Sequence, residues 1–161
     1  MADDVIIKRI SDEDADAMRR LYEMSLRIND KGFVQDLAYH GDIFARAQKY
    51  QRERGDMLGA HINGKLSGFG GLCKVNDDNV ELGKLHLHPD FQGRGIGRTL
   101  AETLINRARE LNYKIVSLHV TVTQNAAIGL YKRLGFIETH RRLCQVESES
   151  FDTIFMELPL V

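Results

Sequence analysis

Near the centre of the chain the sequence reads Gln92-Gly93-Arg94-Gly95-Ile96-Gly97, between an apolar run that ends at Pro89 and a helical pattern that begins at about Gly95. Glycines allow the backbone to turn tightly and to approach a ligand without an intervening Cβ atom. The N–H groups that open a helix, together with the helix dipole, attract anions, and Arg94 and Arg98 add positive charge. The stretch therefore predicts a phosphate or pyrophosphate site. The alternative is that the glycines only shape a turn and the arginines are solvated.

Two common nucleotide-binding loops do not fit this stretch. A Walker loop requires Gly-Lys-Ser or Gly-Lys-Thr after its glycines, and neither follows here. A dinucleotide loop requires Gly-x-Gly-x-x-Gly after the first strand of a strand–helix–strand unit. Here the third glycine comes one residue early, and a predicted hairpin precedes the strand. The turn thus favours neither nucleoside triphosphates nor dinucleotides.

The apolar pattern around the turn predicts one domain, 1–161, with the element order β-α-α-β-β-β-α-β-α-β-β. Asn63-Gly64 is the strongest short hairpin signal in the chain, and Ser11 with Asp14 indicates the start of a helix whose buried face includes Ile28. We expect strands at 5–10, 57–62, 66–75, 80–88, 115–122, 136–144 and 151–158. We expect helices at about 12–28, 33–54, 95–111 and 124–134. This order predicts a mixed sheet with helices on both faces, an α/β or α+β domain.

Composition narrows the class of protein. Hydrophobic residues make up 43% of the 161 residues and charged residues 28%, as in globular proteins. No apolar run approaches the ~20 residues that span a membrane, and the acidic start lacks a secretory pattern. The net charge of -1 gives no reason to expect nucleic acid. Cys73 and Cys144, far apart in strand-like stretches, predict buried structural thiols and suit a reducing cytoplasm. We therefore expect a cytoplasmic protein with no membrane or nucleic-acid partner.

The central turn resembles the defining motif of the GNAT superfamily of acyl-CoA-dependent N-acyltransferases, (Gln/Arg)-x-x-Gly-x-(Gly/Ala), with Gln92, Gly95 and Gly97 in the matching places. The run Leu85–Gly93 is similar to the superfamily's approach to this turn, and Leu130–Phe136 is similar to a second element downstream. The resemblance covers nearly the whole chain. It implies a GNAT-like fold, with a central mixed, mostly antiparallel sheet of about seven strands and about four helices. It also implies N-acetyltransferase activity with acetyl-CoA as co-substrate and no metal.

The resemblance implies that the acetyl-CoA pyrophosphate lies on backbone N–H groups of the turn and that the pantetheine arm pairs with the strand before it. The Leu87 N–H would polarise the thioester carbonyl. Asn125 is also a candidate contact, although Gln124 stands at the family's asparagine position, and which of the two contacts CoA stays open. The cofactor-binding residues implied in this way are Leu85, Leu87, Gln92, Gly93, Arg94, Gly95, Ile96, Gly97, Arg98, Thr99 and Asn125.

Two residues are the candidate catalytic groups. Tyr131 matches the family tyrosine near the CoA sulfur, and a phenol can protonate a departing thiolate. The alternative is a tyrosine packed under the sheet. Glu81, four residues before Leu85, is the candidate base, since an amine with a pKa near ~10.4 arrives protonated. The alternative is a surface carboxylate, or one that only binds the cationic amine.

The resemblance places the acceptor site at about 28–50 and 141–155. The carboxylates there suit a cationic acceptor such as a polyamine, an aminoglycoside or a lysine side chain, or they are ordinary surface charge. The polar residues concerned are Asp30, Asp36, Tyr39, His40, Asp42, Tyr50, Glu147, Glu149 and Asp152.

Three functions stay open. They are acetylation of a small primary amine by direct attack in a ternary complex, the same reaction on a protein lysine or N-terminus, and a non-catalytic acyl-CoA sensor. A homodimer is expected by analogy with the superfamily.

Two further patterns are discounted as binding sites. His86 and His88 alternate on one predicted strand, so both would face the same side, but no second ligand cluster is visible for a metal. The charged stretch Arg46–Arg54 reads as a solvated helix face.

Overall fold

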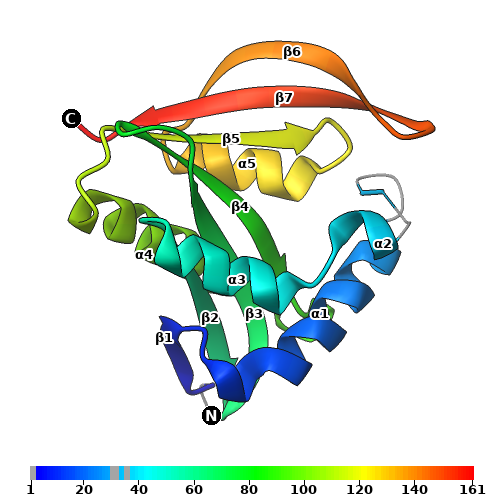
Figure 1. Cartoon of the computed structure of the whole chain (residues 1–161), viewed down its shortest axis with the longest axis vertical. Coiled ribbons are helices and arrows are strands. Elements are labelled where there is room, and N and C mark those ends of the chain that lie inside the picture. The colour runs from blue at the N-terminus through cyan, green and yellow to red at the C-terminus, as the bar shows by residue number, and fades with distance from the viewer. Residues whose placement is uncertain (1–2, 30–32, 35–36) are drawn as a thin grey trace.

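The computed structural model describes residues 3–29, 33–34 and 37–161, and within these ranges it contains one seven-stranded sheet (Figure 1). The strand order is β1-β2-β3-β4-β5-β7-β6, and each neighbouring pair is antiparallel except β4 and β5. The strands are β1 (Val5–Arg9), β2 (Asp56–Ile62), β3 (Lys65–Lys74), β4 (Asn79–Leu87), β5 (Ile115–Thr121), β6 (Ile137–Val146) and β7 (Glu149–Pro159). The predicted mixed, mostly antiparallel sheet is confirmed.

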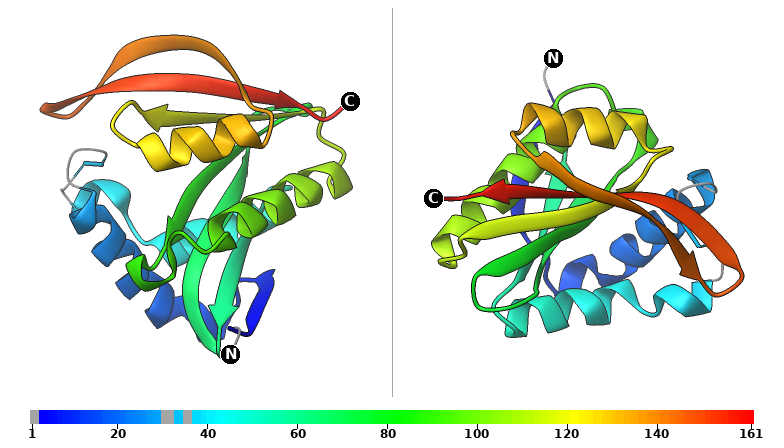
Figure 2. Two further views of the ribbon diagram at one scale, coloured as in Figure 1. Left: turned by 180° about the vertical axis from the view of Figure 1, so that it is seen from behind. Right: turned by 90° about the horizontal axis from the view of Figure 1, so that it is seen from above.

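Helices cover both faces of the sheet (Figure 2). The helices are α1 (Ala15–Ile28), α2 (Leu37–His40), α3 (Ile43–Arg52), α4 (Ile96–Glu110) and α5 (Asn125–Arg133). One core cluster joins Leu104 of α4 to Tyr131 of α5. A second joins Met18 of α1 and Ala47 of α3 to Phe69 of β3, and a third, smaller cluster joins Ala60 and Ile62 of β2 to Ile96 of α4. Among the described helices, none is long and apolar enough to cross a membrane.

Local signals in the sequence set several element boundaries as predicted. Asn63 and Gly64 have φ values of 52° and 82°, which suit the tight turn between β2 and β3. The Asp14 carboxylate accepts a hydrogen bond from the Ser11 N–H at 2.9 Å, as expected at a helix start. Gly135, with φ of 100°, follows α5.

Two details of the helix predictions are wrong. The helix expected at 33–54 is broken, because Gly41 has a φ of 67° and the Asp42 carboxylate then caps α3 through the Phe44 N–H at 3.1 Å. In α1 the buried face ends with Leu26, whereas Ile28 is 53% exposed where the helix stops.

A β-bulge in β4 reverses the side-chain alternation of the strand. Gly71 pairs with Gly83 and Phe69 with His86, so two residues of β4 oppose one residue of β3. Lys84 takes a left-handed φ of 55° at this point. As a result Leu82 and Leu85 both face the α4 side, although they are three residues apart.

Strands β4 and β5 separate soon after they meet. They pair only from Asn79↔Ile115 to Glu81↔Ser117, yet β4 continues to Leu87 and β5 to Thr121. Figure 1 shows the two strands diverging beyond this point. The C-terminal halves of the two strands are therefore not paired with each other, and each leads through a short connection into a helix, β4 into α4 and β5 into α5.

Candidate active site

The glycine turn joins the end of β4 to the start of α4. Gly93 and Gly95 have φ values of 77° and 81°, a region that favours glycine. No described atom lies within 4 Å of the place where a Cβ would stand at Gly93, Gly95 or Gly97. The outer surface of the turn is therefore open, and the first N–H groups of α4 point out of the helix end, as an anion site requires.

Two of the backbone groups predicted to bind pyrophosphate are already used inside the protein. The Gln92 N–H donates to the Pro89 carbonyl at 3.3 Å, and the Thr99 N–H donates to the Gly95 carbonyl at 3.1 Å. The N–H groups that suit a ligand are therefore those between these two residues.

Both arginines of the turn are paired with carboxylates. Arg94 donates to Asp3 at 2.8 Å and lies over the Phe91 ring, while Arg98 donates to Glu102 at 2.7 Å. Each arginine side chain is 54% exposed. Because exposed ion pairs contribute little free energy, either arginine can exchange its partner for a phosphate at small cost.

The Gln92 side chain makes a hydrogen bond to the last residue of β4. Its side-chain Nε2 donates to the Leu87 carbonyl at 3.1 Å. The His88 N–H donates to Ser67 of β3 at 2.7 Å. Since backbone groups alternate along a strand, those of Leu85 and Leu87 point away from β3, and the Leu87 carbonyl accepts from Gln92 on that side. This is the orientation that the predicted pairing with a pantetheine arm requires.

Tyr131 lies under the sheet on the side of α4 and α5. It is 8% exposed and packs edge-on against Phe136 at 5.7 Å. Burial raises its pKa to about 12, so the phenol stays protonated at neutral pH. Gln124 directly precedes α5 and Asn125 is its first residue, so both stand at the same helix start.

Glu81 lies on the opposite side of the sheet, at the last pair before β4 and β5 diverge. Its side chain is 39% exposed, and its Oε2 lies 3.7 Å from His119 Nδ1 of β5. Sequence reasoning missed His119; its place in the strand beside β4 was the available signal. Glu81 and Tyr131 therefore lie on opposite faces of the sheet.

A buried polar chain lies on the Glu81 side of β4, and sequence reasoning missed it. Lys84 Nζ lies 3.2 Å from the Tyr22 hydroxyl, which lies 3.2 Å from His40 Nδ1. His40 Nε2 lies 2.6 Å from the Val34 carbonyl. A carbonyl only accepts, so the geometry assigns the His40 proton to Nε2. Tyr22 then donates to His40, and its oxygen accepts from Lys84. Burial, with a smaller contribution from the charge of Arg46, lowers the pKa of Lys84 to about 8.

The two histidines near the end of β4 do not form a metal site. His86 is buried against Tyr22 and Phe69 at ring distances of 5.1 and 5.4 Å, and burial lowers its pKa to about 3. His88 lies beyond the strand, where its Nδ1 accepts the Asp90 N–H at 3.1 Å. Among the described residues, no three His, Cys, Asp or Glu side chains are placed to hold a metal ion.

The cysteines are less buried than predicted, since Cys73 and Cys144 are both partly exposed free thiols. Burial and the neighbouring Glu81 raise the pKa of the Cys73 thiol. A raised pKa leaves a thiol protonated and a poor nucleophile.

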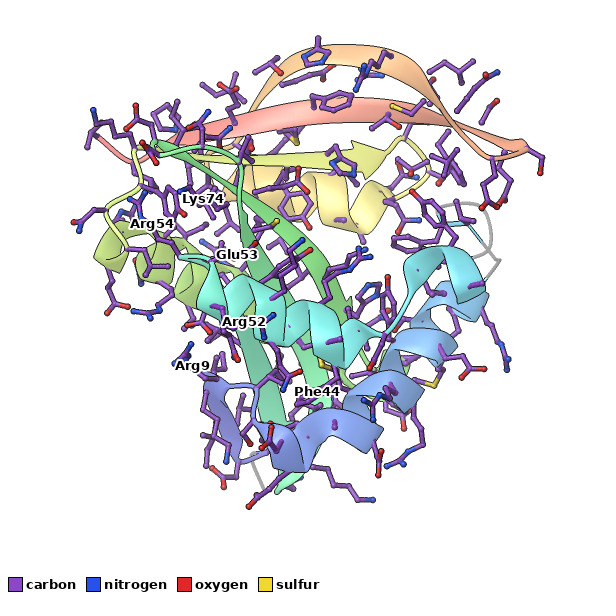
Figure 3. All side chains as sticks on the ribbon, viewed as in Figure 1. Arg9, Phe44, Arg52, Glu53, Arg54 and Lys74 are labelled. Atoms are coloured by element: carbon purple, nitrogen blue, oxygen red, sulfur yellow. The ribbon has the colours of Figure 1, made fainter. Side chains whose placement is uncertain are left out.

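The charged stretch is also only partly solvated. Arg54 donates to the carbonyls of Leu111 and Asp77 at 2.8 Å and lies over Tyr113 (Figure 3).

The predicted acceptor residues do not form one cluster. Asp42 is bound to Arg19 at 3.0 Å, while Glu147 and Glu149 lie in and beside the β6–β7 turn. Asp30 and Asp36 lie outside the described residues. A groove of about 500 Å³ runs between α1 and the α2–α3 segment, and both Tyr22 and His40 line it.

Comparison with known proteins gives the family. The profile of the acetyltransferase (GNAT) family matches residues 15–136. An uncharacterized N-acetyltransferase of Methanocaldococcus jannaschii is 32% identical over 139 residues, which cover 82% of this chain and 60% of that protein. The [ribosomal protein bS18]-alanine N-acetyltransferase of Escherichia coli is 34% identical over 100 residues, 61% of this chain and 67% of that protein. The chain thus spans about 60% of the length of the M. jannaschii relative.

Solved structures share the fold. A putative acetyltransferase, yncA, from Salmonella typhimurium, with its cofactor acetyl-CoA, has a TM-score of 0.86 at 22% identity, over 98% of this chain and 95% of that one. A phosphinothricin acetyltransferase from Sinorhizobium meliloti, in complex with AcCoA, has a TM-score of 0.84 at 18% identity, over 97% and 88% of the two chains. The predicted GNAT-like fold is confirmed, and the chain belongs to the acetyltransferase (GNAT) family.

Proposed function

We propose that this chain is an N-acetyltransferase that moves the acetyl group of acetyl-CoA to a small primary amine, by direct attack in a ternary complex. The observation that carries the proposal is the divergence of β4 and β5 beyond Glu81 and Ser117. Strand β4 leads from this point into the glycine turn, with Glu81 on one face of the sheet and Tyr131 on the other. A binding sensor would need the turn but neither of these two side chains.

The donor is held by main-chain groups in this proposal. The open N–H groups after Gly93 receive the pyrophosphate, with Arg94 and Arg98 as charge partners. The backbone edges of Leu87 and Leu85 receive the pantetheine arm. The arm starts at the turn and therefore reaches Leu87 first and Leu85 second. This order favours the Leu85 N–H for polarising the thioester carbonyl, instead of the Leu87 N–H implied by the resemblance.

Two side chains then handle protons. Glu81 accepts the proton that the ammonium group must lose, directly or through water, and the free amine attacks the thioester carbonyl. Tyr131, neutral because its pKa is about 12, donates a proton to the departing thiolate from the other side of the sheet. The acetylated nitrogen then loses its second proton to water, and the Tyr131 phenolate is protonated again from water. The reaction removes a proton from the acceptor amine and adds one to the CoA thiolate. A base on the acceptor side and an acid on the donor side serve these two steps.

A second candidate is the same reaction on a protein N-terminus. Its support is the similarity to the bS18-alanine N-acetyltransferases. We favour the small amine because a groove of about 500 Å³, the scale of small-molecule sites, lies on the Lys84 side of β4. Tyr22 and His40 line this groove, whereas Glu81 and Lys84 do not. A homodimer and a cytoplasmic location stay predictions from the sequence.

The test measures CoA thiol release with a panel of amines and with an alanine-initiated peptide. We expect Glu81→Gln and Tyr131→Phe each to lower kcat by about 10²- to 10⁴-fold, as loss of a general base or acid does. Glu157→Gln is the control, because Glu157 is exposed and follows Glu81 and Ser117 across the same face of the sheet. The reaction is excluded if no amine releases CoA and acetyl-CoA does not raise the melting temperature.

A further inference from the structure

Two cations on the acceptor side of the bulge, Lys84 and Arg46, have no ion pair among the described residues, although the charge of Glu81 acts on Lys84 from a greater distance. Lys84 is half-buried, and its hydrogen bond is to the neutral Tyr22 hydroxyl. Arg46 of α3 is half-buried, and its Nη2 donates to the neutral His40 carbonyl at 3.1 Å. Within the described ranges, no carboxylate lies within ion-pair distance of either side chain. Cations withdrawn from water are ordinarily paired, so these two side chains point to an anion that the described residues do not supply.

The backbone at Lys84 supports a ligand-binding role for its side chain. Lysine rarely takes a left-handed φ, and here it takes one of 55° inside a strand. A glycine would adopt this conformation without strain, and Gly83 stands directly beside it. Strain that persists in a site is a reason to look for a function of the side chain.

The polar chain behind Lys84 sets the direction of its donors. His40 is fixed by the Val34 carbonyl, so the Tyr22 hydroxyl donates to His40 and presents its oxygen to Lys84. This contact uses one of the three ammonium donors. The other two have no acceptor within the described part of the chain, and they are available to a ligand.

We propose that Lys84 and Arg46 form an anion-binding site for a carboxylate, or another oxyanion, on the acceptor amine. The inference rests on the proposed function, because it concerns the acceptor of the same reaction. Glu81 faces the same side of β4 as Lys84, on the other side of the bulge. An amino acid places an ammonium and a carboxylate a short distance apart, and these charges complement Glu81 and Lys84. The acceptor is then a zwitterionic amine rather than a polyamine or a peptide N-terminus.

The experiment compares matched acceptors in the CoA-release assay with the full chain. Each pair is an amino acid and its carboxamide, with aminoalkyl phosphonates added to separate a carboxylate from a phosphorus oxyanion. Spermidine and an alanine-initiated peptide complete the panel. We expect kcat/KM to be about 10- to 100-fold higher for the anionic member of a pair, the effect of a charge-assisted hydrogen bond.

Variants assign the effect to the site. Lys84→Met removes the charge and should lower kcat/KM for the anionic acceptor to the level of its carboxamide, while KM for acetyl-CoA is unchanged. Lys74→Met is the matched control, because Lys74 lies at the far end of β3 in an exposed pair with Asp77 (Figure 3), and it should behave as wild type. The shift of melting temperature with acetyl-CoA confirms that each variant folds.

The outcomes separate the two proposals. Equal or better turnover of carboxamides, spermidine or the peptide, or an unchanged preference in Lys84→Met, overturns the anion site and leaves the acetyltransferase proposal standing. Absence of CoA release with every amine and with the peptide overturns the proposed function and this inference with it.

Discussion

The contact between Asp3 and Arg94 predicts that the N-terminal segment competes with acetyl-CoA for the turn. The Asp3 carboxylate accepts from Arg94 at 2.8 Å and from the Asn63 side chain at 3.1 Å, which holds it over the turn. Any phosphate that uses Arg94 must displace this carboxylate. Substitution of Asp3 by Asn removes the competing charge while keeping an acceptor for Asn63.

The size of the effect follows from the exposure of the pair. The Arg94 side chain is 54% exposed and the Asp3 side chain 29%, and ion pairs of this kind contribute about 0.2–1 kcal/mol. Since 1.4 kcal/mol is a factor of ten in an equilibrium constant, Asp3→Asn should lower the Kd for acetyl-CoA by about 1.5- to 5-fold. The gain should shrink at ~1 M salt, where screening acts over about 3 Å.

Titration calorimetry with acetyl-CoA at low and high salt measures this change. Asp4→Asn is the matched control, since it alters net charge equally, and among the described residues the Asp4 carboxylate has no recorded ion pair. The competition is refuted if the two variants bind acetyl-CoA equally at low salt, because the gain would then come from net charge alone.

Two predictions concern stability. The fully buried Asp56 forms ion pairs with Arg9 (Figure 3) and Arg107 at 2.9 Å each. Asp56→Asn should lower the free energy of unfolding by about 2–4 kcal/mol. This figure already allows for the weakening of the Arg9 pair by solvent, because the Arg9 side chain is 56% exposed. Urea denaturation checks this, and a loss below about 1 kcal/mol would contradict it. His86 has its pKa lowered to about 3, against ~6.5 in the unfolded chain, so acidification protonates the unfolded state first. The free energy of unfolding should therefore fall by about 1.4 kcal/mol per pH unit as pH drops from ~6.5 toward 3, and His86→Phe, which keeps the ring packing, should flatten this slope. Denaturation series at pH 7, 6 and 5 test it, and equal slopes for wild type and variant would exclude His86 as the cause.

The order of the helices and strands and the position of the glycine turn could be predicted from the sequence, because residues close together in the sequence determine them. Asn63-Gly64 selects a tight turn from two residues, and the glycines at 93 and 95 mark positions with positive φ. The break of the second helix at Gly41 was missed, although Gly41 and the capping residue Asp42 are local signals that stand side by side in the sequence.

The β-bulge in β4 could not be predicted from the sequence. Without it, the predicted strand assigns some side chains to the wrong face of the sheet. Alternation puts Glu81 on the face of Leu85, four residues later, whereas the extra residue at Lys84 puts them on opposite faces. Nothing in the letters around Lys84 marks it as the bulged position. The partners of Lys84 and Arg94 were equally invisible, because Tyr22 is 62 residues from the first and Asp3 is 91 residues from the second.

Where β4 and β5 diverge, the proposed donor contacts are made by the main chain and the proposed acceptor contacts by side chains. This difference decides which amino-acid substitutions each half of the site can tolerate. The proposed donor site consists of backbone groups of the glycine turn and of β4. Any sequence that keeps the turn and the divergence of the two strands therefore keeps this site. On the other side the proposed acceptor contacts are the side chains of Lys84, from β4, and Arg46, from α3. Substitution of these two residues should therefore change the choice of acceptor while the backbone that binds the donor and the proposed base Glu81 stay in place.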